Sequence, residues 1–126
     1  MKPYLPTESN KFAKTVKVTV ATGTTSQPIY LNAVQPYKLD SVSGSFSSNA
    51  SGNLTIKVIR SGNEIAVFSK DLSGAGTFLV SDIGAWLRVT PKNMLTNLPV
   101  DNPGTDVVII DNNTDQDLTA VLDFVY

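Results

Sequence analysis

The chain has 126 residues, contains neither histidine nor cysteine, and carries a formal net charge of −1. This length is typical of one domain whose core is large enough to fold without disulfides. The composition excludes thiolate metal sites and histidine acid–base catalysis, and the near-neutral charge argues against general attraction to nucleic acid.

The first 13 residues are predicted to form an extended arm. They contain Pro3, Pro6, Ser9-Asn10 and scattered charges, a composition that suits neither a strand nor a helix. We therefore divide the chain into an N-terminal arm, residues 1–13, and a single β-sandwich domain, residues 14–126.

Alternation of apolar and polar residues begins the body of the chain. It places Val16, Val18 and Val20 on one face of a half-buried strand. Similar short runs follow, separated by clusters of Ser, Gly, Asn and Asp that are typical of turns. The predicted strands cover residues 14–22, 28–35, 37–46, 53–60, 64–70, 77–81, 85–90, 106–111 and 117–126. About 8–9 short strands predict an all-β fold, an antiparallel β-sandwich of jelly-roll type.

The clearest predicted hairpin turns at Ser61-Gly62-Asn63, where Gly62 or Asn63 can take a positive φ. Arg60 and Glu64 are then expected to pair across the two strands. The last strand, residues 117–126, is substantially apolar on both faces, which favours a central position in a sheet or a place in an interface.

The connection from Pro91 to Thr105 is the longest, and it is too apolar for a purely solvated loop. It either packs over one end of its own sandwich or forms a contact surface for another subunit. An extended arm can likewise lie along the edge strand of a neighbouring subunit. The candidate subunit contacts in these two segments are Tyr4, Leu5, Phe12, Met94, Leu95 and Leu98.

Charge is unevenly distributed along the chain. Residues 101–126 carry six aspartates and no lysine or arginine, whereas four lysines and one glutamate lie in residues 1–17. The opposed ends attract either within one subunit or between neighbouring copies.

Four alternating oxygen side chains, Asp111, Asn113, Asp115 and Asp117, resemble the opening of a calcium loop. The match stops there, because glutamine follows where the loop needs glycine, and Leu122 stands where it needs a bidentate glutamate. An Asx-rich hairpin turn accounts for the same residues. We predict no metal and no cofactor, with a calcium site as the alternative, to which Asp101 and Asp106 would add ligands.

A second alternative is a carbohydrate-binding module. If Leu87 and Val89 face the core, Trp86 and Arg88 point outward together, with the guanidinium stacked on the ring. Trp86, Arg88 and Tyr30 would then form a platform for sugar rings. In the other interpretation, Trp86 caps the sandwich core.

Catalytic patterns are weaker still. The sequence contains no Gly-x-Ser-x-Gly elbow and no phosphate-binding Gly-x-x-x-x-Gly-Lys pattern, and Glu8 and Glu64 are its only glutamates. We predict that the protein is not an enzyme.

The arm Met1–Ala13, the hairpin around Ser61-Gly-Asn63 and the closing strand Asp117–Tyr126 together resemble the small β-sandwich structural proteins of bacteriophage virions. That class includes capsid decoration, cement and fibre-base subunits. The resemblance covers most of the chain in style and rests on no family-specific motif. It implies a non-enzymatic virion protein, made in the host cytoplasm, that binds itself as a homo-oligomer and binds other capsid proteins.

The sequence indicates neither a membrane nor a nucleic acid as partner. Its apolar runs, such as Val107–Ile110, are far shorter than the roughly 20 residues of a membrane-spanning helix. The first residues lead into polar sequence and predict no secretory signal.

Overall fold

The computed structural model describes residues 13–31, 33, 35–89 and 106–126, and its regular elements there are all strands. The strands are β1 (Ala13–Val20), β2 (Thr24–Thr25), β3 (Tyr37–Arg60), β4 (Asn63–Val80), β5 (Ala85–Leu87), β6 (Val107–Thr114) and β7 (Leu118–Val125). Every pair of neighbouring strands is antiparallel. The predicted all-β antiparallel class is confirmed.

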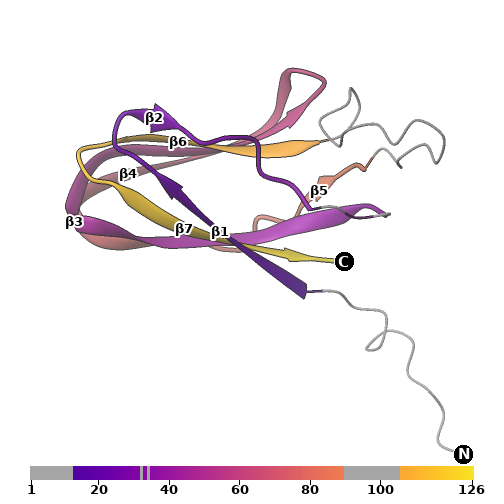
Figure 1. Ribbon diagram of the computed structural model, residues 1–126, viewed down its shortest axis with the longest axis horizontal. Coiled ribbons are helices and arrows are strands. Elements are labelled where there is room, and N and C mark those ends of the chain that lie inside the picture. Colours follow the sequence, from indigo (N-terminus) through magenta and orange to yellow (C-terminus); the bar gives the residue numbers. More distant parts are fainter. Residues whose placement is uncertain (1–12, 32, 34, 90–105) are drawn as a thin grey trace, which may run out of the picture.

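The 24-residue strand β3 organises the architecture. Its first half pairs with β7 from Lys38 to Phe46, and its second half pairs with β6 from Gly52 to Ile59. Between these halves the register shifts, and Gly52 takes a φ of 130°. The strand therefore bends, and one seven-stranded sheet curls until its two halves face each other (Figure 1).

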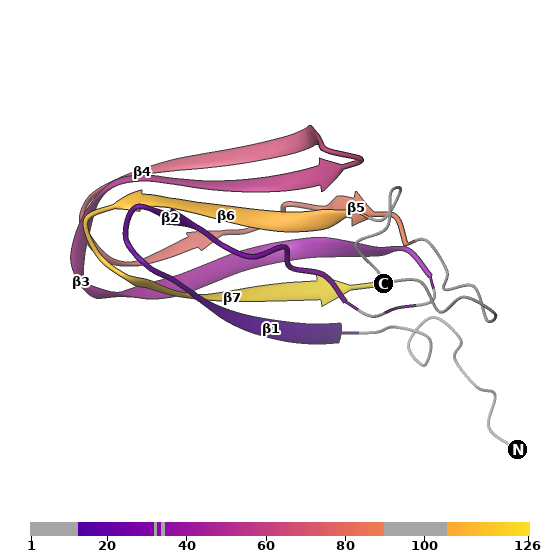
Figure 2. The same cartoon turned by 45° about the horizontal axis from the view of Figure 1, so that its top comes forward.

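The curled sheet does not close on itself. Its strand order is β1-β7-β3-β6-β2, with β4 and β5 also pairing with β3. Strands β1 and β2 therefore stand at the two ends of this order, although only a short corner separates them in the chain. Figures 1 and 2 show them diverging from that corner, so one side of the half-barrel has two edges facing each other.

The described residues form seven strands rather than the predicted 8–9, because two predicted turns are bends inside long strands. Residues 47–52 and 73–76 have turn composition, but β3 and β4 run through them, and the pairing of these two strands shifts register there as in a β-bulge. The predicted strand 28–35 is also wrong. Of its described residues, Ile29 alone pairs, in an isolated bridge with Val108.

The predicted turn within Asp111–Asp115 lies later, because β6 continues to Thr114 and the chain reverses only at residues 115–117. The 61–63 hairpin is confirmed, with a two-residue turn in which Ser61 and Gly62 have φ values of 52° and 80°. The turn pairs Ile59 with Glu64 and Arg60 with Asn63. Arg60 and Glu64 therefore point to opposite faces, and their predicted pairing is wrong.

The core fills the space between the two halves of the sheet. Alternate residues of β7 point inward, and its burial pattern confirms the predicted central position, between β1 and β3. Tyr37 and Phe124 meet edge to face, with ring centres 5.3 Å apart. The Tyr37 hydroxyl accepts the backbone N–H of Leu31 at 2.6 Å, and burial raises the pKa of this phenol. The largest fully buried side chains are those of Tyr37, Phe124, Leu39, Leu54, Ile56, Leu87, Ile110, Leu118 and Leu122.

Candidate interaction surfaces

The corners at one end of the half-barrel are tied together by carboxylates. Asp117 accepts the backbone N–H of Thr22 at 2.9 Å, which joins the β6–β7 turn to the β1–β2 corner. Asp115 accepts the backbone N–H of Ser51 at 2.9 Å, which joins the same turn to the bend of β3. These aspartates accept backbone N–H groups far along the chain, whereas the Asx-turn interpretation predicts bonds to their own neighbouring backbone.

A buried asparagine completes this end. Asn112 is fully buried, and its amide nitrogen donates to the carbonyl oxygens of Val20 at 3.0 Å and Gln116 at 2.9 Å. Its carbonyl oxygen accepts the backbone N–H and the hydroxyl of Thr114 at 3.1 and 2.6 Å. One side chain therefore holds β1, β6 and the β6–β7 turn in place.

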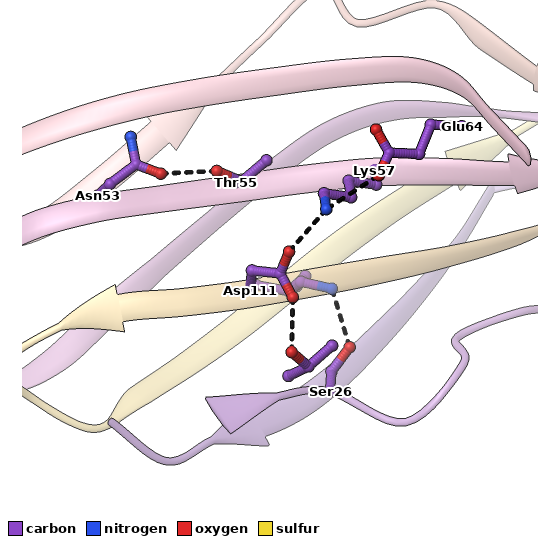
Figure 3. Close-up of polar contacts among 8 residues, drawn as sticks. Ser26, Asn53, Thr55, Lys57, Glu64 and Asp111 are labelled. Carbon is purple, nitrogen blue, oxygen red and sulfur yellow. Dashed lines mark hydrogen bonds and ion pairs between the residues drawn. The ribbon is translucent and has the colours of Figure 1, made fainter. Parts of the chain in front are cut away.

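On the outer face of β3 and β6, Lys57 bridges two carboxylates. Its ammonium lies 3.0 Å from Glu64 and 3.0 Å from Asp111 (Figure 3). The Thr25 hydroxyl donates to Asp111 at 2.6 Å. This hydrogen bond and the lysine hold the pKa of Asp111 below its usual range, and the hydrogen bonds to Asp111 and Glu64 raise the pKa of Lys57. Figure 3 also shows Ser26, whose hydroxyl accepts the Ile110 N–H at 2.9 Å.

The fully buried Asp106 is paired at the opposite end. Both of its oxygens accept from the Arg60 guanidinium, the shortest bond being 2.7 Å, and this carboxylate raises the pKa of Arg60. Asp106 also accepts the backbone N–H of Arg88 at 2.7 Å and donates its own N–H to the Arg88 carbonyl at 3.0 Å. Asp106 therefore fixes the chain beyond β5 to the start of β6.

The described aspartates of the C-terminal part thus contact Lys57, Arg60 and backbone N–H groups of the same subunit. The Asp123 carboxylate likewise accepts hydroxyl hydrogens from Thr15 and Ser41. In the described part of the chain, every buried side-chain nitrogen or oxygen has a hydrogen-bond partner. Within the same ranges, no cluster of three acidic, histidine or cysteine residues could hold a metal ion. The polar groups seen here therefore stabilise the fold.

A groove lies between the two edges of the curled sheet. Its residues come from β1 and from the segment that follows β2: Val16, Val18, Thr19, Ser26, Gln27, Pro28, Ile29 and Tyr30. The groove has a volume of about 570 Å³. Its floor is apolar, because Ile29 belongs to the core and Val16 and Val18 point from β1 to the inner face.

Two features show that the described residues cover this groove only in part. Val16 and Val18 stay half-buried, whereas their partners on β7, Leu122 and Ala120, are fully buried. In the described residues, β1 pairs with β7 alone, so its other edge has no strand beside it. The sequence prediction missed the groove because it gave residues 28–35 to a strand. Pro28, which cannot donate a ladder hydrogen bond, is the signal that argued against that strand.

Trp86 lies on β5 and is 55% exposed, whereas Leu87 is fully buried, as the predicted orientation requires. The cation beside its ring is Lys38, with its ammonium 5.9 Å from the ring centre, rather than the predicted Arg88. Tyr30 lines the groove at the β1 edge and makes no ring contact with Trp86 in the part that the structure describes. The structure thus does not assemble these three side chains into one platform.

The predicted subunit contacts lie outside the described residues. These are Tyr4, Leu5, Phe12, Met94, Leu95 and Leu98, and Asp101 of the calcium alternative lies outside them too. Over the described ranges, no helix has the length and apolar character needed to cross a membrane.

Comparison with known proteins gives a likeness of fold alone. No protein-family model and no curated protein sequence matches the chain. One similar solved structure comes from Bacillus endospore appendages, described as a novel family of disulfide-linked pili, with 14% identity and a TM-score of 0.44. The match covers 92% of this chain and 87% of that one.

Another similar structure is that of infectious bursal disease virus, Gx strain, with 12% identity and a TM-score of 0.35. The match covers 92% of this chain but only 29% of the viral chain. The argument for function below therefore rests on the surfaces of this chain.

Proposed function

We propose that this protein is a non-enzymatic structural subunit of a virion, of the capsid decoration, cement, or minor capsid or fibre-base kind. It acts by binding further copies of itself, as a homo-oligomer, and other capsid proteins. The observation that supports this proposal is the edge of β1 that has no strand beside it among the described residues, next to an open apolar groove. An exposed strand edge is a ready template for pairing with another chain, and monomeric proteins normally cover it.

The internal polar contacts support the same proposal. The Lys57 and Asp106 contacts join β3 to β6 and to the residue before it, and the Asn112 contact joins the end of β1 to β6. Such a rigid body can present its edges and corners to neighbours without reorganising. The arm and the 91–105 segment, with the six apolar residues predicted from sequence, would supply the contacts that join subunits.

Light scattering coupled to size exclusion tests self-association across a wide range of protein concentration. We expect the full chain to form discrete oligomers or larger particles, and removal of residues 1–12 to lower the mass toward that of a folded monomer. Trp86→Ala is the matched control, because Trp86 lies on β5, away from the groove-lining residues, and should keep the wild-type mass. A monomer at every concentration that also fails to bind capsid proteins would overturn the proposal.

A carbohydrate-binding module is the second candidate. The half-exposed indole of Trp86, with the Lys38 ammonium beside it, favours this function, because sugar rings stack on exposed indoles. Glycan-array binding by the full chain, lost in Trp86→Ala while the circular dichroism spectrum is kept, would support it. Absence of binding by the wild-type chain would contradict it.

A further inference from the structure

We infer that the groove between β1 and residues 26–30 receives the N-terminal arm of a second copy of this chain, with Tyr4 and Leu5 as its apolar anchors. This inference rests on the proposed function, which it deepens by naming the acceptor surface. The groove requires a partner with apolar side chains and an extended backbone. The composition of the first residues of the chain suits both requirements.

The groove is shaped for an extended segment. Along one side runs β1, whose outer edge has no strand beside it in the described part, so alternate backbone groups face the groove. Along the other side runs the segment from Ser26 to Tyr30. An added strand would pair with β1 and place alternate side chains on the apolar floor at Val18 and Ile29.

The arm has the right composition to occupy the groove. Tyr4 and Leu5 are flanked by Pro3 and Pro6, and proline favours an extended backbone. Leu5 stands eight residues before Ala13, where β1 begins, a span of roughly 26 Å when extended. The anchors can therefore reach well beyond their own subunit.

Register argues for a second copy rather than for the arm of the same chain. To lie beside its own β1, the arm would have to reverse, and the turn residues available are Ser9-Asn10. A two-residue turn there would place Leu5 opposite Lys14 and Tyr4 opposite Thr15. Both anchors would then stop short of the groove, whose β1 residues begin at Val16. The arm of a neighbouring copy has no such restriction.

Disulfide trapping tests the contact directly, because the chain contains no cysteine of its own. Leu5→Cys in one copy and Val18→Cys in another, one of them carrying a size tag, are mixed at equal concentration and oxidised. We expect mixed disulfide-linked dimers to form at least ten times faster than with Val67→Cys as the second variant. Val67 is the matched control, a half-exposed valine on β4, which is also an edge strand but does not line the groove.

The outcomes distinguish a failure of the contact between arm and groove from a failure of the proposed function. If a single chain with both Leu5→Cys and Val18→Cys links only within itself at high dilution, the arm occupies its own groove, and the inference is overturned. Equal trapping at Val18 and Val67 also overturns it. If light scattering still shows an oligomer in either case, the structural role stands and another surface joins the subunits. A monomer that shows no trapping overturns the inference, and it overturns the proposed function only if it also fails to bind capsid proteins.

A second variant checks the groove without cysteines. Val18→Lys introduces a charge at the apolar floor, and we expect it to lower the concentration-dependent mass at least as far as removal of residues 1–12 does. Val67→Lys is its control and should assemble as the wild type does. An unchanged mass in Val18→Lys would contradict the inference, provided that circular dichroism shows the variant to be folded.

Discussion

Replacing Asn112 by alanine should destabilise the fold severely, although Asn112 lies in a stretch that looks like a polar turn. The substitution leaves the Val20 carbonyl and the Thr114 N–H without the hydrogen bonds that the amide provides. Each buried polar group left unsatisfied costs about 1–3 kcal/mol, so we expect a loss of about 3 kcal/mol in the free energy of unfolding. That is a large part of the roughly 5–15 kcal/mol that stabilises a typical domain.

Urea unfolding followed by circular dichroism measures this loss. The control is Asn113→Ala, because Asn113 is the exposed neighbour of Asn112 on the same strand and should stay within about 0.5 kcal/mol of the wild type. If Asn112→Ala loses less than about 1 kcal/mol, Asn112 does not hold the corner in the way described.

Asn112→Asp should make the stability of the folded chain depend on pH through the same site. A carboxylate there would face the carbonyl oxygens of Val20 and Gln116, so burial and repulsion would raise its pKa in the folded state above the unfolded value of about 3.9. The variant should then be nearest to wild-type stability below about pH 4, and should lose stability as the pH rises through the folded-state pKa. A constant difference between variant and wild type from pH 3 to pH 8 would contradict this expectation.

Three further predictions concern the strands and their ion pairs. A Cβ on Gly44 would lie 2.6 Å from the Thr119 carbonyl oxygen, so Gly44→Ala should lower the free energy of unfolding in urea by about 1–3 kcal/mol. Gly76→Ala is the control and should change this free energy little, because a Cβ there would have its nearest neighbour at 3.4 Å. Thr25→Val should raise the pKa of Asp111 in an NMR titration, because it removes the hydrogen bond that lowers this pKa in the folded state. A lowered pKa contributes stability above about pH 4, and this stability is lost as the pH falls through the folded-state pKa. The variant should therefore gain less stability between low pH and neutral pH than the wild type does. Asp106→Ala should lower the melting temperature more than Asp82→Asn does, because Asp82 is exposed and asparagine tolerates its φ of 55°. Equal melting temperatures would show that Asp106 is not needed to fix β6.

The sequence predicts a strand where the alternation of apolar and polar residues follows the alternation of core and outer face along that strand. Residues of β1 and β7 alternate between core and outer face, so a period of two reveals both strands. In β3, the stretch from Ser47 to Gly52 has the composition of a turn. Whether such a stretch reverses or only bends depends on β6 and β7, which lie far along the chain and pair with different halves of β3. Local composition cannot contain that information.

The groove could not be predicted from the sequence for a related reason. The groove exists because the strand order ends at β1 and β2, a property of the whole topology and of no single segment. The partners of Arg60 and Asn112 are likewise distant in sequence, at Asp106 and Val20. In contrast, the outward orientation of Trp86 could be predicted, because it needs only the alternation of its own short strand.

The energetics of an arm in the groove indicate how assembly would behave. Ordering about five arm residues costs roughly 5–10 kcal/mol in backbone entropy. Burying Tyr4 and Leu5 contributes about 2–3 kcal/mol each, and three backbone hydrogen bonds along β1 about 1 kcal/mol each, which together nearly offset that cost. A single arm added as a free peptide should therefore bind too weakly to detect at micromolar concentration. Particles in which every subunit both gives and receives an arm gain from many linked contacts, so their mass should rise steeply with concentration rather than gradually.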